Sequence, residues 1–238
     1  MYGEAYSDNV NNPRVRNTTV SARSIGIGGI AGYSRNINNG YFANGHVIGT
    51  TTGSSNVGGI TGYSGWTISS STVVDSVIES KGDNVGGIKG KLSYSVVSVV
   101  GVYNTKITGR NKVGGIVGTY ESNYNVIQYA VTNSVVTATG SFAGGIIGYV
   151  ANLNTTDQTY RIYIHHDLVE GGIVTASNYA GGLIGYAEKM LFNGHFYNNY
   201  VDCDVSSPSL RGYIIGGHDD YADRISNLAL YAGNKSNN

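Results

Sequence analysis

The sequence is poor in the residue types on which several functional classes of protein depend. Its 238 residues include one cysteine, two prolines and one tryptophan, and charged residues make up only 13%. The single cysteine, Cys203, excludes an internal disulfide framework and a cysteine-rich metal site. Fifteen basic residues balance fifteen acidic ones, so the chain lacks the basic field that recruits nucleic acid or an anionic membrane surface. We therefore expect no nucleic-acid partner.

Hydrophobic targeting segments are also missing. No run reaches the roughly 18 consecutive apolar residues of a membrane-spanning helix, so we expect no membrane insertion. Residues 1–12 lack the basic start and the apolar run of a signal peptide. If the protein is exported, Met1 is expected to be an expression start and the chain an excised segment.

Glycine and tyrosine are abundant, with 36 and 20 copies, and the glycines are periodic. The stretch 56–63, NVGGITGY, has close copies whose glycine pairs begin at residues 28, 86, 114, 144 and 181, with a degraded copy at Gly212. A period near 28–31 residues is typical of a solenoid or a propeller. We expect one domain, 13–231, preceded by an N-terminal extension or cap remnant, 1–12, and followed by a C-terminal tail, 232–238.

Each copy of this glycine-rich stretch is called a glycine rung. A second recurring block precedes each rung and has the form apolar-x-Asx-small-x-apolar. The Asx positions, with one glutamate, are Asn17, Asn44, Asp75, Asn104, Asn133, Glu170, Asp202 and Asn227. The apolar positions before them are Val15, Phe42, Val73, Val102, Val131, Leu168, Tyr200 and Ile225. Those after them are Val20, Val47, Ile78, Ile107, Val136, Ile173, Val205 and Leu230. Both apolar columns are predicted to face inward, with a corner at the Asx, where the left-handed backbone conformation is tolerated.

The glycine rung predicts a second corner. The apolar residue after each glycine pair, such as Ile60 or Ile88, is expected in the core, and the next position is expected to face outward because it holds Lys89 in one copy. The third glycine of each rung indicates a positive φ or a close approach of two backbones. Segments of varying length follow the rungs, so insertions are expected at one corner only.

These patterns predict an all-β fold, a right-handed parallel β-helix (β-solenoid) of about seven coils. A propeller is disfavoured because no Asn-Gly or Asp-Gly hairpin signal recurs between the blocks. Stacked Asn side chains are expected to satisfy one another along the Asx corner, with Glu170 and Asp202 as its weak point.

The Val-Gly-Gly-Ile-x-Gly rungs and the apolar-x-Asn-x-x-Val strands resemble the GLUG repeat of bacterial surface proteins, which include immunoglobulin A-cleaving metallopeptidases and large adhesins. The resemblance covers about residues 15–230 and implies a stalk or an adhesive part of a larger exported protein. The metallopeptidases carry a His-Glu-x-x-His motif that this chain lacks, so the resemblance implies no catalytic residues, metal or cofactor here.

Four motifs have bland interpretations that we prefer. The stretch 26–31 matches a dinucleotide fingerprint but no helical pattern follows it. The group His165-His166-Asp167, with His195 or Asp202, matches no metal-ligand spacing. Asp202 and Asp204 resemble the paired carboxylates of polysaccharide-cleaving β-helix enzymes, yet they fall in the corner and outward columns. Cys203 falls in the small inward column, which favours a buried, inert thiol.

Aromatic residues gather in or beside the variable segments, where rigid rings could hold a sugar or a partner protein. The predicted ligand-binding residues are Trp66, Tyr94, Tyr120, Tyr124, Tyr160, Tyr163, His165, His166, Phe192 and Tyr197. The alternative is that these rings only pack the loops onto the solenoid.

For function, the sequence favours a non-enzymatic, secreted or cell-surface bacterial repeat module that binds a glycan or a host surface protein along its loop edge. The alternative is a polysaccharide lyase or hydrolase of the β-helix type, but the acidic residues are scattered rather than clustered. Because each end coil exposes a strand edge, neighbouring domains or subunits are expected to cap the ends.

Overall fold

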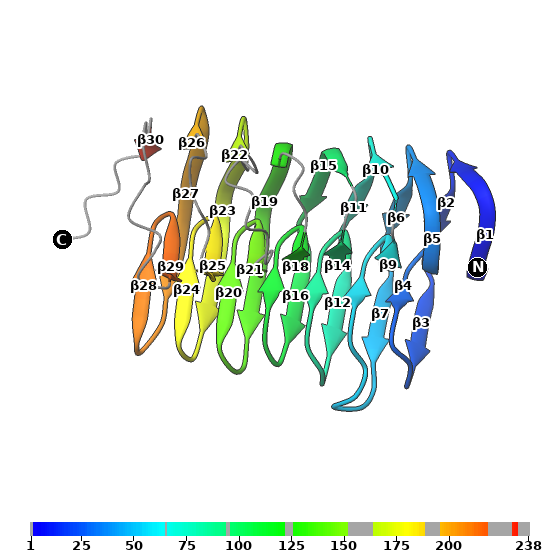
Figure 1. Cartoon of the computed structure of the whole chain (residues 1–238), viewed down its shortest axis with the longest axis horizontal. Coiled ribbons are helices and arrows are strands. Elements are labelled where there is room, and N and C mark those ends of the chain that lie inside the picture. Colours follow the sequence, from blue (N-terminus) through cyan, green and yellow to red (C-terminus); the bar gives the residue numbers. More distant parts are fainter. Residues whose placement is uncertain are drawn as a thin grey trace, which may run out of the picture.

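The protein is an all-β rod in which parallel strands stack as a solenoid (Figure 1). The computed structural model describes residues 2–64, 66–93, 96–121, 126–151, 164–188, 196–218 and 230–232. In these residues the strands form one sheet of 23 strands and one of seven. The smaller sheet has one strand in each coil, and six full turns of the solenoid lead from the first of its seven strands to the last. The predicted parallel β-solenoid is therefore confirmed.

Four strand positions recur in every coil. The smaller sheet contains β4 Ile27–Gly28, β8 Val57–Gly58, β13 Val85–Gly86, β17 Val113–Gly114, β20 Phe142–Gly144, β24 Tyr179–Gly181 and β28 Leu210–Gly212. The strands that follow the rungs are β5 Ala31–Asn38, β9 Thr61–Ser64, β10 Ile68–Ser69, β14 Lys89–Ser93, β18 Val117–Glu121, β21 Ile147–Val150, β22 Ile164–His165, β25 Ile184–Ala187, β26 Phe196–Tyr197 and β29 Ile215–His218. Strand β1 Tyr2–Asn11 precedes the first rung and pairs with β5.

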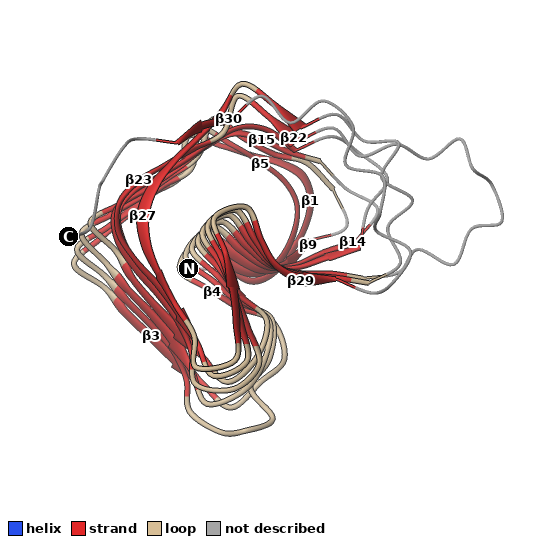
Figure 2. Ribbon diagram, turned by 90° about the vertical axis from the view of Figure 1, so that its left-hand side faces the viewer, coloured by secondary structure: helices blue, strands red, loops and turns tan. Residues whose placement is uncertain are grey.

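The remaining strands lead back towards the smaller sheet. The first group is β2 Arg14–Arg16, β6 Tyr41–Ala43, β11 Thr72–Val74 and β30 Leu230–Ala232, and the second is β3 Thr19–Ala22, β7 His46–Gly49, β12 Val77–Ser80 and β16 Lys106–Gly109. Four longer strands span more than one position, namely β15 Val97–Tyr103, β19 Val126–Ala138, β23 Leu168–Ala176 and β27 Asn199–Ser206. Seen along the rod, the short strands of the smaller sheet lie inside the hook that the larger sheet forms (Figure 2).

The predicted Asx corner is real, and it is one of three left-handed corners in a coil. At this second corner φ lies between 48° and 51°; its residues are Asn17, Asn44, Asp75, Asn104 and Asn133. Five residues earlier, the first corner has φ between 49° and 60°; its residues are Asn12, Asn39, Ser70, Val99, Gln128, His166 and Asn198. The third corner precedes the smaller sheet and consists of Gly26, Asn56, Asn84 and Lys112. The sequence predicted the Asx corner and a corner at the glycine rung, but not the left-handed residues of the first and third corners.

Hydroxyl groups from the next coil complete the hydrogen bonding at the second corner. The backbone N–H groups of Gly45, Ser76 and Thr105 donate to the side-chain oxygens of Ser76, Thr105 and Ser134, at 3.2, 3.4 and 3.1 Å. Each hydroxyl then donates to the carbonyl oxygen two residues before it, at 2.7–3.0 Å. The small inward column is therefore a hydroxyl ladder that satisfies buried N–H groups. The expected Asx ladder is present where Asn104 Nδ2 donates to Asp75 Oδ1 at 3.0 Å.

The predicted columns fail by one residue in the last coils. The glycines at 171 and 172 have φ values of 62° and 89°, so Gly171, and not Glu170, pairs in the position of Asn133. Ile173 is consequently 43% exposed, while Val174 pairs with Val136 and is 2% exposed.

The same shift changes the apolar column before the corner. Val169 and Val201, in place of Leu168 and Tyr200, continue the inward column of Val131. These predictions were wrong because the sequence spacing did not reveal where the extra residue is absorbed. The prediction for Leu230 fails by a separate and larger displacement, since in β30 it pairs with Asn199 rather than with Val205.

The glycine rung brings two backbones into direct contact. A Cβ at Gly58 would lie 2.2 Å from the carbonyl oxygen of Thr61, and one at Gly62 would lie 2.2 Å from the backbone nitrogen of Ile27. Neither glycine has a positive φ. Of the two expected explanations, close backbone approach is confirmed for these positions.

The position after the core isoleucine also faces inward, which corrects the prediction for Lys89. Six residues of this column are fully buried, namely Ala31, Thr61, Lys89, Val117, Ile147 and Ile184, and Ile215 in the last coil is partly buried. Burial lowers the pKa of the Lys89 ammonium from 10.5 to about 7, because desolvation disfavours the charged form. The expectation that a lysine marks an outward column was wrong here.

Insertions are not confined to one corner. The spacing from the second to the third corner is 12 residues between Asn44 and Asn56 but 9 between Asp75 and Asn84. The extra residues form a loop, 50–55, that protrudes between β7 and β8 (Figure 1). The predicted single insertion edge was therefore incomplete.

Candidate functional site

Part of the predicted loop edge lies outside the described residues, namely Tyr94, Tyr124, Tyr160, Tyr163, Phe192 and His195. Tyr197 is placed by its backbone in β26, beside His165. Trp66 is 52% exposed, and the Arg35 guanidinium lies over its ring at 5.5 Å from the centroid. An exposed indole beside a guanidinium offers an aromatic face and hydrogen-bond donors to a ligand.

Tyr120 does not contribute to an exposed edge. Its side chain is 1% exposed, and it stands in the core column between Leu92 and Val150. Tyr129 is equally buried, and its hydroxyl donates to the carbonyl oxygen of Val97 at 2.8 Å. The inclusion of Tyr120 among the ligand-binding residues was therefore wrong, because its side chain points into the solenoid.

His165 and His166 lie at the first corner, where His166 occupies the left-handed position. Their Nδ1 atoms are 2.7 Å apart, and His166 Nε2 lies 3.2 Å from Asn198 Nδ2 in the next coil. Burial and the neighbouring His166 lower the pKa of His165. Within the described part of the chain, no three His, Cys, Asp or Glu side chains converge as a metal-binding group. The contact between His166 and Asn198 joins neighbouring coils at this corner.

Asp167 follows this histidine pair and points inward. It is 2% exposed; its Oδ1 accepts the N–H of Tyr129 at 2.8 Å, and its own N–H donates to Asn199 Oδ1 at 3.1 Å. Burial raises the pKa of its carboxyl well above 3.8, although the Tyr129 hydrogen bond acts in the opposite direction. Asp167 thus repeats, with a carboxyl group, the N–H-accepting role of the second-corner hydroxyls.

A second aromatic group lies between the two sheets. The rings of Phe142 and Tyr179, which pair across β20 and β24, stack at a centroid distance of 5.5 Å. Phe142 also contacts Tyr149 and Tyr186 at 5.1 and 5.0 Å, and Tyr179 contacts Tyr186 at 4.9 Å. The Lys112 ammonium lies 3.9 Å from the Tyr149 ring centroid. The rings pack on one another, so this group joins the two limbs of each coil.

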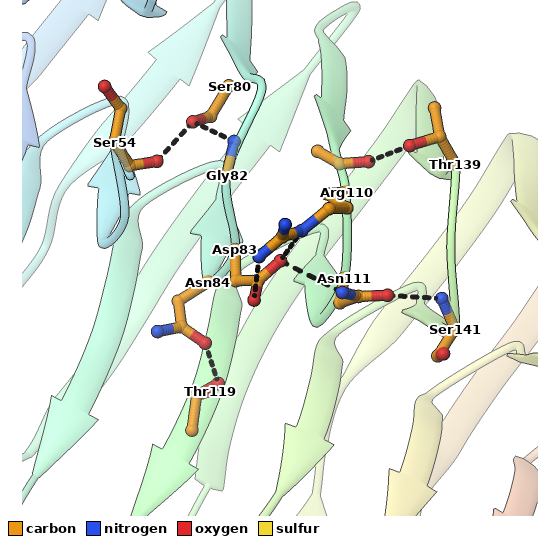
Figure 3. A network of polar contacts seen from close by, with 11 residues as sticks. Ser54, Ser80, Gly82, Asp83, Asn84, Arg110, Asn111, Thr119, Thr139 and Ser141 are labelled. Atoms are coloured by element: carbon orange, nitrogen blue, oxygen red, sulfur yellow. Dashed lines mark hydrogen bonds and ion pairs between the residues drawn. The ribbon is translucent and has the colours of Figure 1, made fainter. Parts of the chain in front are cut away.

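Polar side chains link successive coils at the third corner (Figure 3). Arg110 donates two hydrogen bonds to the carboxylate of Asp83, at 2.8 and 3.0 Å, and Asn111 donates a third at 3.1 Å. Burial raises the pKa of Asp83, but these bonds and the Arg110 charge outweigh it and lower the pKa below 3.8. Asn111 Oδ1 then accepts the N–H of Ser141 at 2.7 Å. The network connects three coils.

Two of the motifs considered in the sequence, Cys203 and the pair Asp202 and Asp204, lie in β27. Cys203 is 9% exposed, and burial, with the carboxylates of Asp204 and Asp202, raises the pKa of its thiol to about 12. The expected burial of the thiol is confirmed. Asp202 pairs beside Glu170 and Asp204 beside Ile173, so both carboxylates lie along one strand, β27.

Within the described residues, no helix is long and apolar enough to cross a membrane.

Comparison with known proteins gives one related structure. No family profile and no curated protein sequence matches the chain. The chain is similar to the crystal structure of a candidate immunoglobulin A1 protease from Bacteroides ovatus, with a TM-score of 0.49 and 18% sequence identity. The match covers 87% of this chain and 66% of that one, so this chain spans slightly less than two thirds of its length.

Proposed function

We propose that this chain is a non-enzymatic repeat module of an exported bacterial surface protein, built from GLUG-like repeats, that serves as a stalk or an adhesive segment. The observation that carries the proposal is the continuity of its hydrogen bonding. Backbone ladders run from coil to coil, and side-chain bonds such as Asn39 to Asn12 and Asn84 to Asn56 run parallel to them at the corners.

A rod of this kind suits a spacer. Each coil contacts only its neighbours, so the length grows with the number of repeats while the cross-section stays constant. The interior column of Val, Ile and Leu side chains is bordered by a corner at which hydroxyl groups accept the N–H groups of Gly45, Ser76 and Thr105. Such a rod projects whatever stands at its edge or end away from a surface.

The adhesive part of the proposal rests on the loop edge at Trp66. A sugar ring or a peptide that stacks on this indole gains on the order of 1 kcal/mol, so single sites bind weakly. Many copies on one cell surface turn weak sites into strong attachment. We assign the ligand to glycans or host surface proteins.

Apolar side chains are exposed at both ends of the rod, which favours a partner that covers them. At the last coil Leu210 and Tyr213 are 52% and 63% exposed, and a hollow of 330 Å³ is bordered by Val205 and Arg211. At the first coil Ile25 is 69% exposed. Neighbouring domains or subunits that continue the coils would cover these apolar side chains.

The proposal is tested with purified protein on immobilised glycans and host surface proteins, with the same polysaccharides assayed for cleavage. We expect binding without cleavage, and we expect Trp66→Ala to weaken binding about fivefold with an unchanged thermal melt. Tyr103→Ala is the control, since Tyr103 is also exposed (36%) but lies in β15, away from the loop edge. Release of shortened saccharides would contradict the proposal and indicate that the chain is a polysaccharide-cleaving enzyme.

A further inference from the structure

A second hollow lies on the outer face of three adjacent coils, beside the inserted loop 50–55. It has a volume of 430 Å³, within the range of small-ligand sites. Ile48 of β7, Glu79 of β12 and Thr108 of β16 line it, together with Thr50 and Lys81. Ile48, Glu79 and Thr108 are paired in one row across the three strands.

Hydrogen bonds within the loop and to neighbouring strands hold the loop beside the hollow in place, and Figure 3 shows the one between Ser54 and Ser80. Ser54 is fully buried; its Oγ accepts the N–H of Thr51 at 3.2 Å, and its carbonyl oxygen accepts a bond from Ser80 Oγ at 2.6 Å. Thr50 Oγ1 donates to the carbonyl oxygen of Ala22 at 3.1 Å. An insertion anchored in this way gives the hollow a fixed wall, which lowers the entropic cost of binding.

The groups around the hollow offer both charges and a hydroxyl. Glu79 Oε1 lies 3.0 Å from His46 Nε2 without a hydrogen bond, so this contact is an ion pair only when the imidazole is protonated. Lys81 is exposed at the rim. The Thr108 hydroxyl is shielded from solvent and has no hydrogen-bond partner among the described residues. Rotation of the Thr108 side chain about its Cα–Cβ bond would turn this hydroxyl towards the hollow, where a ligand supplies the missing partner.

From this arrangement we propose that the hollow is a saccharide-binding site. A sugar ring has one apolar face, which fits the Ile48 side chain, and a rim of hydroxyls that both donate and accept hydrogen bonds. The Glu79 carboxylate accepts from such hydroxyls, the Lys81 ammonium donates to them, and Thr108 does either. The inference rests on the proposed glycan-binding function, but it places a site away from the loop edge.

The test is titration of the isotope-labelled chain with N-acetylglucosamine, galactose, mannose and glucuronate, followed by NMR. We expect one of these sugars to shift the methyl signals of Ile48 and Thr108. Glu79→Gln and Thr108→Val should each raise the apparent Kd about tenfold, because the first replaces a charged acceptor with a weaker neutral one and the second removes the hydroxyl.

Thr137→Val is the matched control, since Thr137 follows Thr108 in the same row but does not line the hollow. Equal effects of Thr108→Val and Thr137→Val would overturn the site. Shifts at Trp66 with none at Ile48 would overturn this inference while leaving the proposed function intact. Absence of shifts with all four sugars would also overturn it, and the adhesion assay on host proteins would then decide the proposed function separately.

Discussion

Lys89 is a charged residue type at a fully buried position in the middle of the rod. Its folded pKa of about 7 lies below the 10.5 of an exposed lysine, so the folded state binds fewer protons between these values. Stability therefore rises as pH increases from 7 to 10.5, and the full penalty is present below pH 7. A difference of this size corresponds to on the order of 4 kcal/mol.

We expect Lys89→Met to raise the free energy of unfolding at pH 7 by about 3 kcal/mol and to flatten its pH dependence above pH 7. Denaturant titrations at several pH values measure both effects. Lys91→Met, two residues along β14, is the control, because the Lys91 ammonium pairs with Glu121 at 3.0 Å near the surface. A stability of Lys89→Met equal to that of the original chain would mean that the ammonium is solvated in the folded state.

Val99 is a β-branched residue in the left-handed conformation, with φ of 52°. Asparagine occupies the same corner at residues 12, 39 and 198 and tolerates this conformation far better than valine. We expect Val99→Asn to stabilise the fold by about 1 kcal/mol. Thermal unfolding measures the change, and Val77→Asn on a strand serves as the control that should not stabilise. A lower melting temperature for Val99→Asn would contradict the inference that the left-handed backbone conformation of Val99 is strained.

At the scale of the elements, the hydroxyl ladder at the second corner joins one coil to the next. At this corner the backbone turns so that the N–H groups of Gly45, Ser76 and Thr105 are accepted by side chains of the next coil. The role does not need a particular residue type, since serine and threonine perform it at this corner and Asp167 performs it beyond the first corner.

We expect Ser134→Ala to destabilise the protein by about 1–2 kcal/mol, because the Thr105 N–H then lacks its acceptor at 3.1 Å. Hydrogen exchange at the Thr105 amide should accelerate at the same time. Ser177→Ala removes an exposed hydroxyl bonded to the Thr139 carbonyl oxygen and should change stability by less than about 0.5 kcal/mol. If the Thr105 amide keeps its protection in Ser134→Ala, the ladder is not its acceptor.

For the whole molecule, stability is distributed along the rod because each coil contacts only its two neighbours. The inward column shows the gradient directly: Val47 and Ile78 are fully buried in the interior coils, while Val20 and Val205 at the two ends are only partly buried.

We therefore expect hydrogen exchange to be slowest in β12, β13 and β16 and fastest in β3 and β28. Exchange measured by mass spectrometry on the isolated chain, with its oligomeric state determined in parallel, gives this profile. Equal protection from end to end in a monomer would contradict the gradient and the need for capping partners.

The sequence by itself determined the repeat, the parallel solenoid and most inward columns. Every coil buries the same side chains at the same place, so the spacing of Val, Ile and glycine encodes the register directly. The tertiary structure alone decided which residues close the corners, because positions such as Val99, Gln128 and His166 share a conformation and no residue type. It also decided the burial of Lys89 and Tyr120 and the row formed by Ile48, Glu79 and Thr108. The direction in which a side chain points and the residues that lie beside it are set only when the coils stack.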